Sequence, residues 1–418
     1  MLTLYKVIPE RLEYYLEVTR AGTPGLFYER DGYWRSPGIS GVDTSAVILG
    51  ERLLGLGSGI DPRTRRVLNV FQRQVRTCAL DMTFAAPKGV SMLFALGNDR
   101  TRQAVELAQR NSVLETMDFV DRKIISVSRR VAGVRNLRHA RTIDQAIFEH
   151  RTSRALDPHL HSHVLVPNLA SDDAVCWSAF DFRPLFVHVG LLGSLYRSGL
   201  RHHLSATLGV RWREIQPGWY DLAGLSPPMI RSFSRRRQEI FEEVADLGLS
   251  SNRATAIAAG RSRSPRSLGV SYDELLEGWR VRAHRLGIST SRLEEVTGNR
   301  QVQATDPYLQ MTSVIADLGA KRQEVMLVEL LQRLANSARS GTSIADLEAG
   351  IERAVASRVI GVPRDLWPYG PRRTRLSERE RVPQSARSLW NVRTGPQGLQ
   401  VSRPISPGRT GRLGQIMA

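Results

Sequence analysis

One stretch of the sequence decides the fold: His150-Arg151-Thr152-Ser153-Arg154-Ala155-Leu156-Asp157-Pro158-His159-Leu160-His161-Ser162-His163-Val164-Leu165-Val166. Its second half alternates and predicts a strand with Leu160, Val164 and Val166 on one face. His161 and His163 therefore share the opposite face. Residues 153–158 have turn chemistry, which folds His150, at the end of a preceding apolar run, back beside them. We predict that three imidazoles converge from two neighbouring strands.

Three converging neutral imidazoles leave coordination positions open, as a catalytic metal site requires and a closed structural site does not. A lone His-x-His on a strand is more often satisfied polar surface. The third histidine and the strand context favour metal binding, with His150, His161 and His163 as the ligands. His159 has the same parity as His161, so it is either a fourth ligand or, in the interpretation we favour, a residue at the rim of the site.

The spacing His150-x-x-Ser153-Arg154-x-x-Asp157-Pro158-x-Leu160-His161-x-His163 resembles the three-histidine motif of the MobF-type (TrwC/TraI-like) conjugative relaxases, members of the HUH endonuclease superfamily. Leu80-Asp81-Met82-Thr83-Phe84-Ala85-Ala86-Pro87-Lys88-Gly89-Val90-Ser91 resembles their second motif, and Tyr14-Tyr15 resembles their nucleophile motif. The three motifs follow the family's order. The resemblance implies an α+β palm-and-fingers fold, in which helices flank a central antiparallel sheet that carries the metal site.

The resemblance also implies an activity: metal-dependent, site- and strand-specific DNA nicking at an origin of transfer by tyrosine transesterification. The product is a covalent 5′-phosphotyrosyl intermediate that serves conjugative mobilisation. By position Tyr14 is the principal nucleophile. Phe27 stands where the first member of the family's second tyrosine pair falls, so Tyr28, the remaining member, or Tyr33 serves a second strand transfer, or Tyr14 acts alone. The expected ion is Mg²⁺ or Mn²⁺, with Zn²⁺ or Ni²⁺ as alternatives.

Two other functions remain open. A rolling-circle replication initiator uses the same histidine cluster and tyrosine. A relaxase-derived accessory protein that binds DNA without cutting it is consistent with Phe27 and with the absence of a Gly-x-x-x-x-Gly-Lys-Ser/Thr motif, which a helicase motor requires.

Asp81 is the candidate partner of the histidines. Alternation puts it opposite Leu80 and Met82 in a strand, where its carboxylate is placed to accept the free ring N–H of a ligating histidine. We also consider a direct catalytic role for Asp81 in taking the tyrosine proton. Pro87 is predicted to open a helix, and Lys88 beside it is a candidate phosphate contact.

The charge of the chain predicts a polyanionic partner. Its 59 Lys and Arg exceed its 41 Asp and Glu, for a formal charge of +18 and a pI near 10.8. Basic residues near the motifs are candidate DNA contacts: Lys88, Arg151, Arg154, Arg235, Arg236 and Arg237. The last three follow Ser226, which is predicted to cap a continuous helix with Phe233 and Phe241 on its buried side.

The chain divides by composition into three parts. Residues 1–295 form the predicted relaxase domain, with helical fingers from about 225. Residues 296–365 form a small helical extension. Residues 366–418 form a basic tail that we expect to be disordered, because ten arginines from Gly370 onward stand among few apolar residues.

The expected setting is the cytoplasm. No apolar run is long enough to span a bilayer, the N-terminal residues lack a signal-peptide pattern, and two cysteines provide no disulfide framework. Single-stranded DNA at an origin of transfer is the expected partner. The resemblance further implies accessory DNA-binding proteins, a coupling protein and secretion machinery.

Overall fold

The computed structural model describes the central part of the chain almost continuously and its ends in pieces. The described residues are 1–12, 32–35, 46–60, 65–67, 77–131, 134–139, 143–171, 177–246, 258, 270–288, 293, 295–298, 312–315, 317, 324–356, 360–361, 391–395 and 398–402. The side chains of residues 46–51, 126–139, 171, 177–179, 324–326, 355 and 360–402 are not described.

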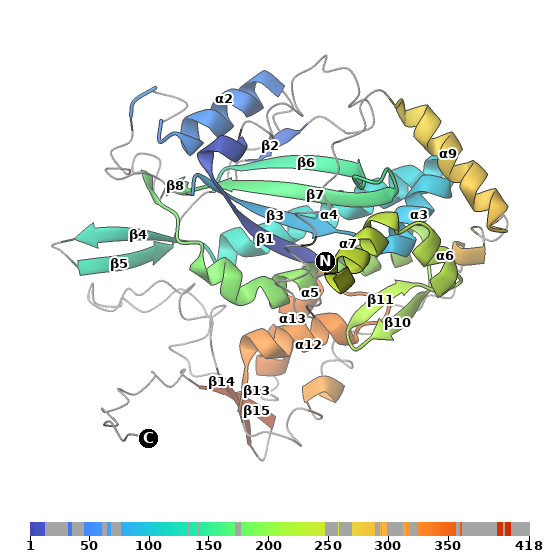
Figure 1. The fold of residues 1–418 in the computed structure, drawn as a ribbon. Coiled ribbons are helices and arrows are strands. Elements are labelled where there is room, and N and C mark those ends of the chain that lie inside the picture. The colour runs from blue at the N-terminus through green and yellow to red at the C-terminus, as the bar shows by residue number, and fades with distance from the viewer. Residues whose placement is uncertain are drawn as a thin grey trace, which may run out of the picture.

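A five-stranded sheet forms the centre of the molecule (Figure 1). Its strands, in spatial order, are β1 (Leu2–Val7), β3 (Ala79–Ala85), β7 (Pro158–Pro167), β6 (Gln145–Thr152) and β2 (Tyr33–Arg35). Every neighbouring pair is antiparallel. The prediction of an α+β fold built on a central antiparallel sheet is confirmed.

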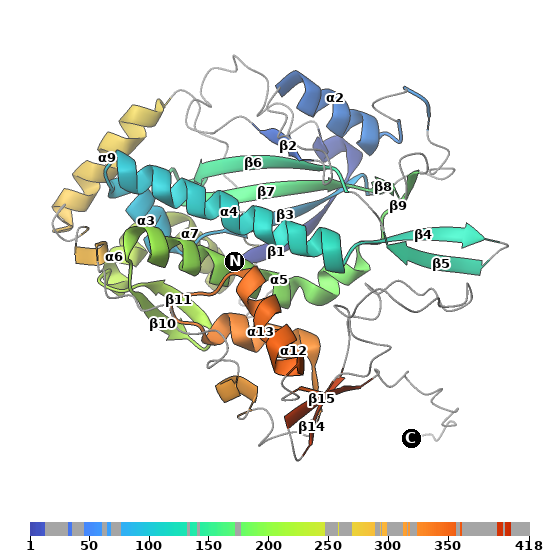
Figure 2. The same ribbon diagram turned by 180° about the vertical axis from the view of Figure 1, so that it is seen from behind.

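One face of this sheet is closed by long helices. In Figure 2, α4 (Asp99–Lys123) crosses in front of the strands and α5 (Arg183–Leu208) runs below it, while α3 (Lys88–Leu96) follows β3. Alternate strand residues such as Leu80, Phe84 and Val164 are fully buried there. Their spacing of two gives the sheet an apolar side that the helices cover.

The opposite face is covered at one end by α2 (Ala46–Gly57), which contacts β2 and β7. A second apolar cluster fills that end and contains Leu12, Trp34, Leu56, Phe148 and Leu165. Beyond this cluster the strands carry the histidines instead of apolar residues. The same face therefore passes from core at one end to a polar site at the other.

Two helical elements at the turn end of the β6–β7 hairpin make up the fingers: the pair α6 (Pro227–Ser232) and α7 (Arg235–Asp246), and α9 (Tyr272–Arg285) (Figure 1). Ser226 caps α6 as predicted, but the prediction of one continuous helix is wrong. The helix breaks at Phe233 and Ser234, because the first turn of α7 bonds to a carboxylate on the hairpin turn rather than to α6. Phe241, predicted to be buried, is 54% exposed.

Of the helices beyond the fingers, α12 (Leu327–Ser337) packs on α5 and α13 (Ile344–Ala356) packs on α4 and α12. Leu330 and Leu334 of α12 and Ile351 of α13 belong to the same buried cluster as Phe84 of the sheet. Arg201 of α5 is 2% exposed and donates to the carbonyl oxygens of Ala335 and Ala338. This part of the chain therefore shares the core of the sheet.

Residues 391–395 and 398–402 differ from the predicted disordered tail. They form β14 (Asn391–Gly395) and β15 (Gly398–Ser402), an antiparallel hairpin that pairs with β12 (Glu324–Met326) and β13 (Ile360–Gly361). Strand partners from elsewhere in the chain satisfy this backbone, which the composition of the tail alone does not indicate.

Three small ribbons complete the described structure: β4 (Ser126–Val131) with β5 (Val134–His139), β8 (Leu169–Ser171) with β9 (Trp177–Ala179), and β10 (Trp212–Gln216) with β11 (Trp219–Leu222). The first projects away from the sheet in both ribbon views. None of the helices within the described ranges is long and apolar enough to cross a membrane.

Candidate metal centre

The hairpin of β6 and β7 brings three histidines together on one face of the sheet. His150 lies directly opposite His161 in the strand register, and His163 follows two residues later on β7. One ring nitrogen from each histidine lies within 4.8 Å of the other two. The ring centroids are 5.0 to 5.1 Å apart. The predicted convergence of His150, His161 and His163 is confirmed.

Hydrogen bonds orient the rings of His161 and His163. Nδ1 of His161 lies 2.8 Å from the carbonyl oxygen of His159, and Nδ1 of His163 lies 2.8 Å from Oδ2 of Asp81. Because both partners accept, each Nδ1 must carry the proton. The Nε2 atom of each ring then keeps its lone pair for a ligand.

Burial keeps His161 in the form that binds metal. It lowers the pKa of His161 well below the usual value, and the neighbouring imidazoles lower it further. A neutral imidazole is the form that ligates, so His161 is ready to coordinate at neutral pH. Three imidazole nitrogens at this separation fit one divalent ion.

Asp81 supports the site from β3. It is 3% exposed, and Oδ1 accepts from the Thr83 hydroxyl at 3.2 Å as well as lying 3.0 Å from His163 Nδ1. Thr83 Oγ1 is itself 3.1 Å from the same ring nitrogen. A buried carboxylate therefore holds the tautomer of His163, as Asp81 was predicted to do for a ligating histidine.

His159 lies beside the cluster rather than in it. Its ring stacks on that of His161, with centroids 4.5 Å apart and planes at 29°. Burial lowers its pKa to about 3, so it is neutral as well. The group of convergent nitrogens consists of His150, His161 and His163, which places His159 at the rim.

The predicted nucleophile Tyr14 and the second candidate Tyr28 lie outside the described residues. Residues 9–12 are helical, and Leu12 is the last described residue before these two tyrosines. Leu12 is buried in the apolar cluster beneath α2, on the histidine face of the sheet. The described chain therefore reaches that face two residues before Tyr14.

The predicted DNA contacts are engaged within the protein to different degrees. Lys88 donates to the carbonyl oxygen of Pro158 at 2.7 Å, and burial lowers its pKa to about 8. Arg151 is paired with Glu106 at 2.6 Å, and Arg154 is half-buried in the hairpin turn.

The three arginines that open α7 differ in their surroundings. Arg235 is paired with Asp157, and Arg236 is paired with Glu239 at 3.0 Å. Arg237 is exposed, with its guanidinium 5.2 Å from the centre of the Phe241 ring. A cation over an exposed aromatic ring makes a surface on which a nucleic-acid base can stack.

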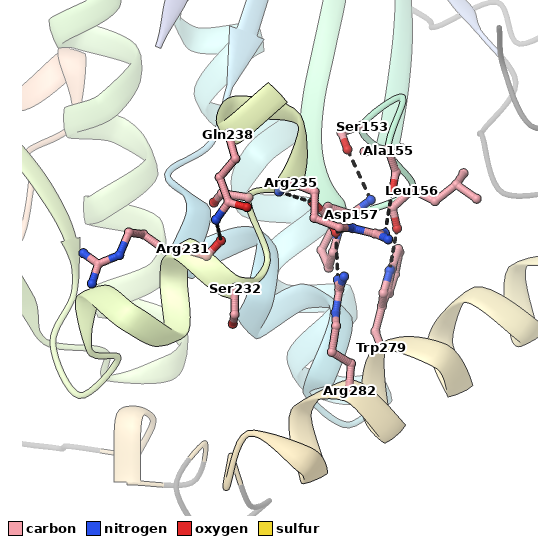
Figure 3. A network of polar contacts seen from close by, with 12 residues as sticks. Ser153, Ala155, Leu156, Asp157, Arg231, Ser232, Arg235, Gln238, Trp279 and Arg282 are labelled. Carbon is pink, nitrogen blue, oxygen red and sulfur yellow. Dashed lines mark hydrogen bonds and ion pairs between the residues drawn. The ribbon is translucent and has the colours of Figure 1, made fainter. Parts of the chain in front are cut away.

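Sequence reasoning missed the polar network around Asp157. Figure 3 shows its carboxylate between the hairpin turn, the start of α7 and α9, with Arg235 and Arg282 pointing at it. The sequence signal was present in an acid inside the histidine motif, but its partners are 78 and 125 residues away.

The fold is similar to that of solved structures of a conjugative relaxase. The structure of conjugative relaxase TrwC in complex with oriT DNA in a metal-bound state has a TM-score of 0.61, with 24% identity, and the match covers 69% of this chain and all of the other. TrwC with a 27-mer DNA comprising the recognition hairpin and the cleavage site gives a TM-score of 0.60 at the same identity and coverage. The fold is that of a relaxase domain.

The family follows from the sequence. The model of the TrwC relaxase family matches residues 10–286, about two thirds of the chain, and the chain belongs to that family. The multifunctional conjugation protein TraI of Escherichia coli is 27% identical over 303 residues, and TraI of strain K12 is 26% identical over 302. These alignments cover 66% of this chain but only 16% of each TraI. The resemblance carried by the three motifs is confirmed.

Proposed function

We propose that this chain nicks one strand of DNA at an origin of transfer, with Tyr14 as the nucleophile and a divalent ion held by His150, His161 and His163. The observation that carries the proposal is the oriented histidine cluster, backed by Asp81, in a chain of the TrwC relaxase family. TrwC itself has been solved bound to oriT DNA and to metal, which supports the choice of substrate.

When bound, the ion would stabilise charge that develops on the oxygens of the scissile phosphate. The three imidazoles would hold it, and Asp81 keeps His163 in the ligating tautomer. Imidazole nitrogens suit Zn²⁺ and Ni²⁺ better than Mg²⁺ or Mn²⁺, which prefer oxygen ligands, so the three donors favour the alternatives Zn²⁺ and Ni²⁺ over the expected Mg²⁺ or Mn²⁺.

The proposed chemistry exchanges one phosphodiester bond for another. The Tyr14 oxygen attacks the scissile phosphorus, the bond to the 3′ oxygen breaks, and the departing strand leaves with a 3′ hydroxyl. A phenol has an unperturbed pKa of about 10, so the attack needs a base or a nearby positive charge. Asp81, whose carboxylate contacts His163, is our candidate for the base that takes the tyrosine proton.

The 5′-phosphotyrosyl bond conserves the energy of the cleaved linkage, so the strand can be rejoined. Tyr28 is proposed for a second transfer, since Phe27 cannot attack. Because the chain belongs to the TrwC relaxase family, we also propose that it acts with accessory DNA-binding proteins, a coupling protein and secretion machinery.

The test is cleavage of labelled single-stranded oligonucleotides that tile the origin region of the element that encodes the chain. Wild-type protein should release a 3′ hydroxyl product and carry a covalent 5′ adduct, which mass spectrometry maps to Tyr14. Tyr14→Phe should yield no adduct, whereas Tyr28→Phe should leave first cleavage intact. An adduct at Tyr28 would reassign the nucleophile, and binding without any cleavage would favour a non-catalytic accessory protein.

A further inference from the structure

Asp157 is a fully buried carboxylate in the turn that joins the two metal-ligating strands. Its exposed fraction is 0%. The backbone around it is unusual, because Leu156 has a φ of +54° and the strand register shifts between His150 and Thr152. A non-glycine residue with positive φ costs free energy, so other contacts must hold this turn in shape.

The contacts that hold the turn come from the fingers (Figure 3). Arg235, the first residue of α7, donates its backbone N–H to Asp157 Oδ2 at 2.7 Å and its Nε to Oδ1 at 3.0 Å. Arg282 of α9 donates to the same Oδ1 at 2.8 Å. One carboxylate thereby joins two helices that are separated in the sequence.

The turn backbone is held from the same side. Arg235 donates to the carbonyl oxygen of Ala155 at 2.6 Å, and the indole N–H of Trp279 donates to that of Leu156 at 2.8 Å. Trp279 is 3% exposed, so its N–H would otherwise be a buried unsatisfied donor. The turn thus has a hydrogen bond from the fingers at three successive residues.

The shape of this turn sets how the metal ligands face one another. In the strand register Thr152 lies opposite Pro158, and the next pair is His150 opposite His161. A shift of one residue in this register would turn His150 to the opposite face of the sheet. Whatever fixes the turn therefore fixes the distance between a ligand on β6 and a ligand on β7.

We propose that Asp157 is a positioning residue that docks the finger helices on the β6–β7 turn and thereby sets the geometry of the metal ligands. It binds no metal itself. The inference rests on the proposed metal site, but it does not depend on the nicking chemistry. The same set of contacts around Asp157 would then dock the finger helices and hold the three histidines in the geometry that binds metal.

The experiment measures Co²⁺ binding by the full chain, using titration calorimetry for affinity and the visible ligand-field spectrum for geometry. Asp157→Asn should weaken Co²⁺ binding about tenfold, in the range seen when residues that orient ligands are changed. It should also alter the spectrum of the saturated protein. Trp279→Phe removes one N–H and keeps most of the packing, so it should shift both quantities in the same direction by less.

Asp181→Asn is the matched control. Asp181 is also a buried carboxylate that accepts a backbone N–H and a guanidinium, but both come from Arg183, two residues away, at the start of α5. The Asp181→Asn variant should have a lower free energy of unfolding, and its Co²⁺ affinity and spectrum should match those of wild type.

Unaltered Co²⁺ affinity and spectrum in folded Asp157→Asn would overturn the proposal, as would an equal effect of Asp181→Asn. If Asp157→Asn does not fold, Trp279→Phe decides, because it must then show the spectral change. A wild-type protein that binds no Co²⁺ would refute the metal site itself. A wild-type protein that binds Co²⁺ but does not nick DNA would count only against the proposed chemistry.

Discussion

The two faces of the central sheet come from the same strands and do different things. On β3 and β7, the residues at one parity, such as Phe84 and Val164, are fully buried beneath α4 and α5. At the other parity, beyond the second apolar cluster that includes Leu165, the side chains of Asp81, His161 and His163 form a polar cluster. A strand with period two can thus carry the fold on one side and the chemistry on the other, without a residue in common.

The two faces should also differ in how well they tolerate mutation. The apolar face is held by many interchangeable contacts, so the loss of one side chain weakens the fold without removing it. The polar face depends on a few directed bonds that neighbouring groups can replace only in part. Mutations on the two faces should therefore separate stability from function.

The largest effect is expected on the polar face. His163→Ala should abolish nicking while most DNA affinity remains, because binding is spread over many phosphate contacts and the metal acts on one. A chelator should do the same to wild type. Cleavage assays and DNA titrations at one salt concentration test this, and wild-type cleavage by His163→Ala in metal-free buffer would refute the metal assignment.

On the apolar face, Phe84→Ala should lower the free energy of unfolding by about 3–5 kcal/mol, because it leaves a cavity in a tightly packed region. The ring of Phe84 is fully buried and meets that of Tyr196 edge-on, with centroids 5.2 Å apart. Denaturant unfolding measures the loss. Metal affinity below the transition should match wild type, and a large drop in it would show that the faces are not independent.

A smaller effect on the polar face tests the role of Asp81. Asp81→Ala should weaken metal binding about 10- to 100-fold, because His163 loses the acceptor that holds its ring. The loss should be incomplete, since Thr83 Oγ1 lies 3.1 Å from the same ring nitrogen. Thr83→Val, measured by the same metal titration, should cost less than Asp81→Ala; the reverse order would make Thr83 the principal partner.

Short-range patterns predicted the site, because its ligands are close in the sequence. Alternation around His161 and His163, with a turn before them, sufficed to bring His150 opposite His161. The capping box of Ser271 and Glu274, which opens α9, is likewise set by residues that are three apart in the sequence. Each of these depends on the residues of one strand, turn or helix.

Long-range contacts account for what the sequence left undetermined. From the sequence alone, Asp157 is expected to be a turn residue, and Arg235 and Arg282 are expected to be exposed charges. Only the fold brings the two arginines to the carboxylate. The break before α7 follows from the same contact, because a helix whose first N–H binds another element must begin there. The β14–β15 hairpin likewise depends on pairing with β12 and β13.

The last prediction concerns the basic tail, residues 366–418. Six arginines fall between Gly370 and Asn391, outside the strands β14 and β15. Changing all six to Gln should weaken binding to any single strand, cognate or scrambled, and make the slope of log affinity against log salt shallower by up to about four, at roughly 0.7 for each phosphate that the tail no longer neutralises. Sequence discrimination should persist, because we assign base recognition to the folded domain.

The matched variant changes the same six arginines to Lys, which keeps the charge and removes the guanidinium geometry. Because counterion release depends on charge, this variant should retain the wild-type slope. Titrations at several salt concentrations compare the three proteins. Equal slopes for the Gln variant and wild type would rule out the tail as a DNA tether and leave docking of a protein partner as its role, whereas a wild-type slope only in the Lys variant would establish that the tail contributes charge to DNA binding.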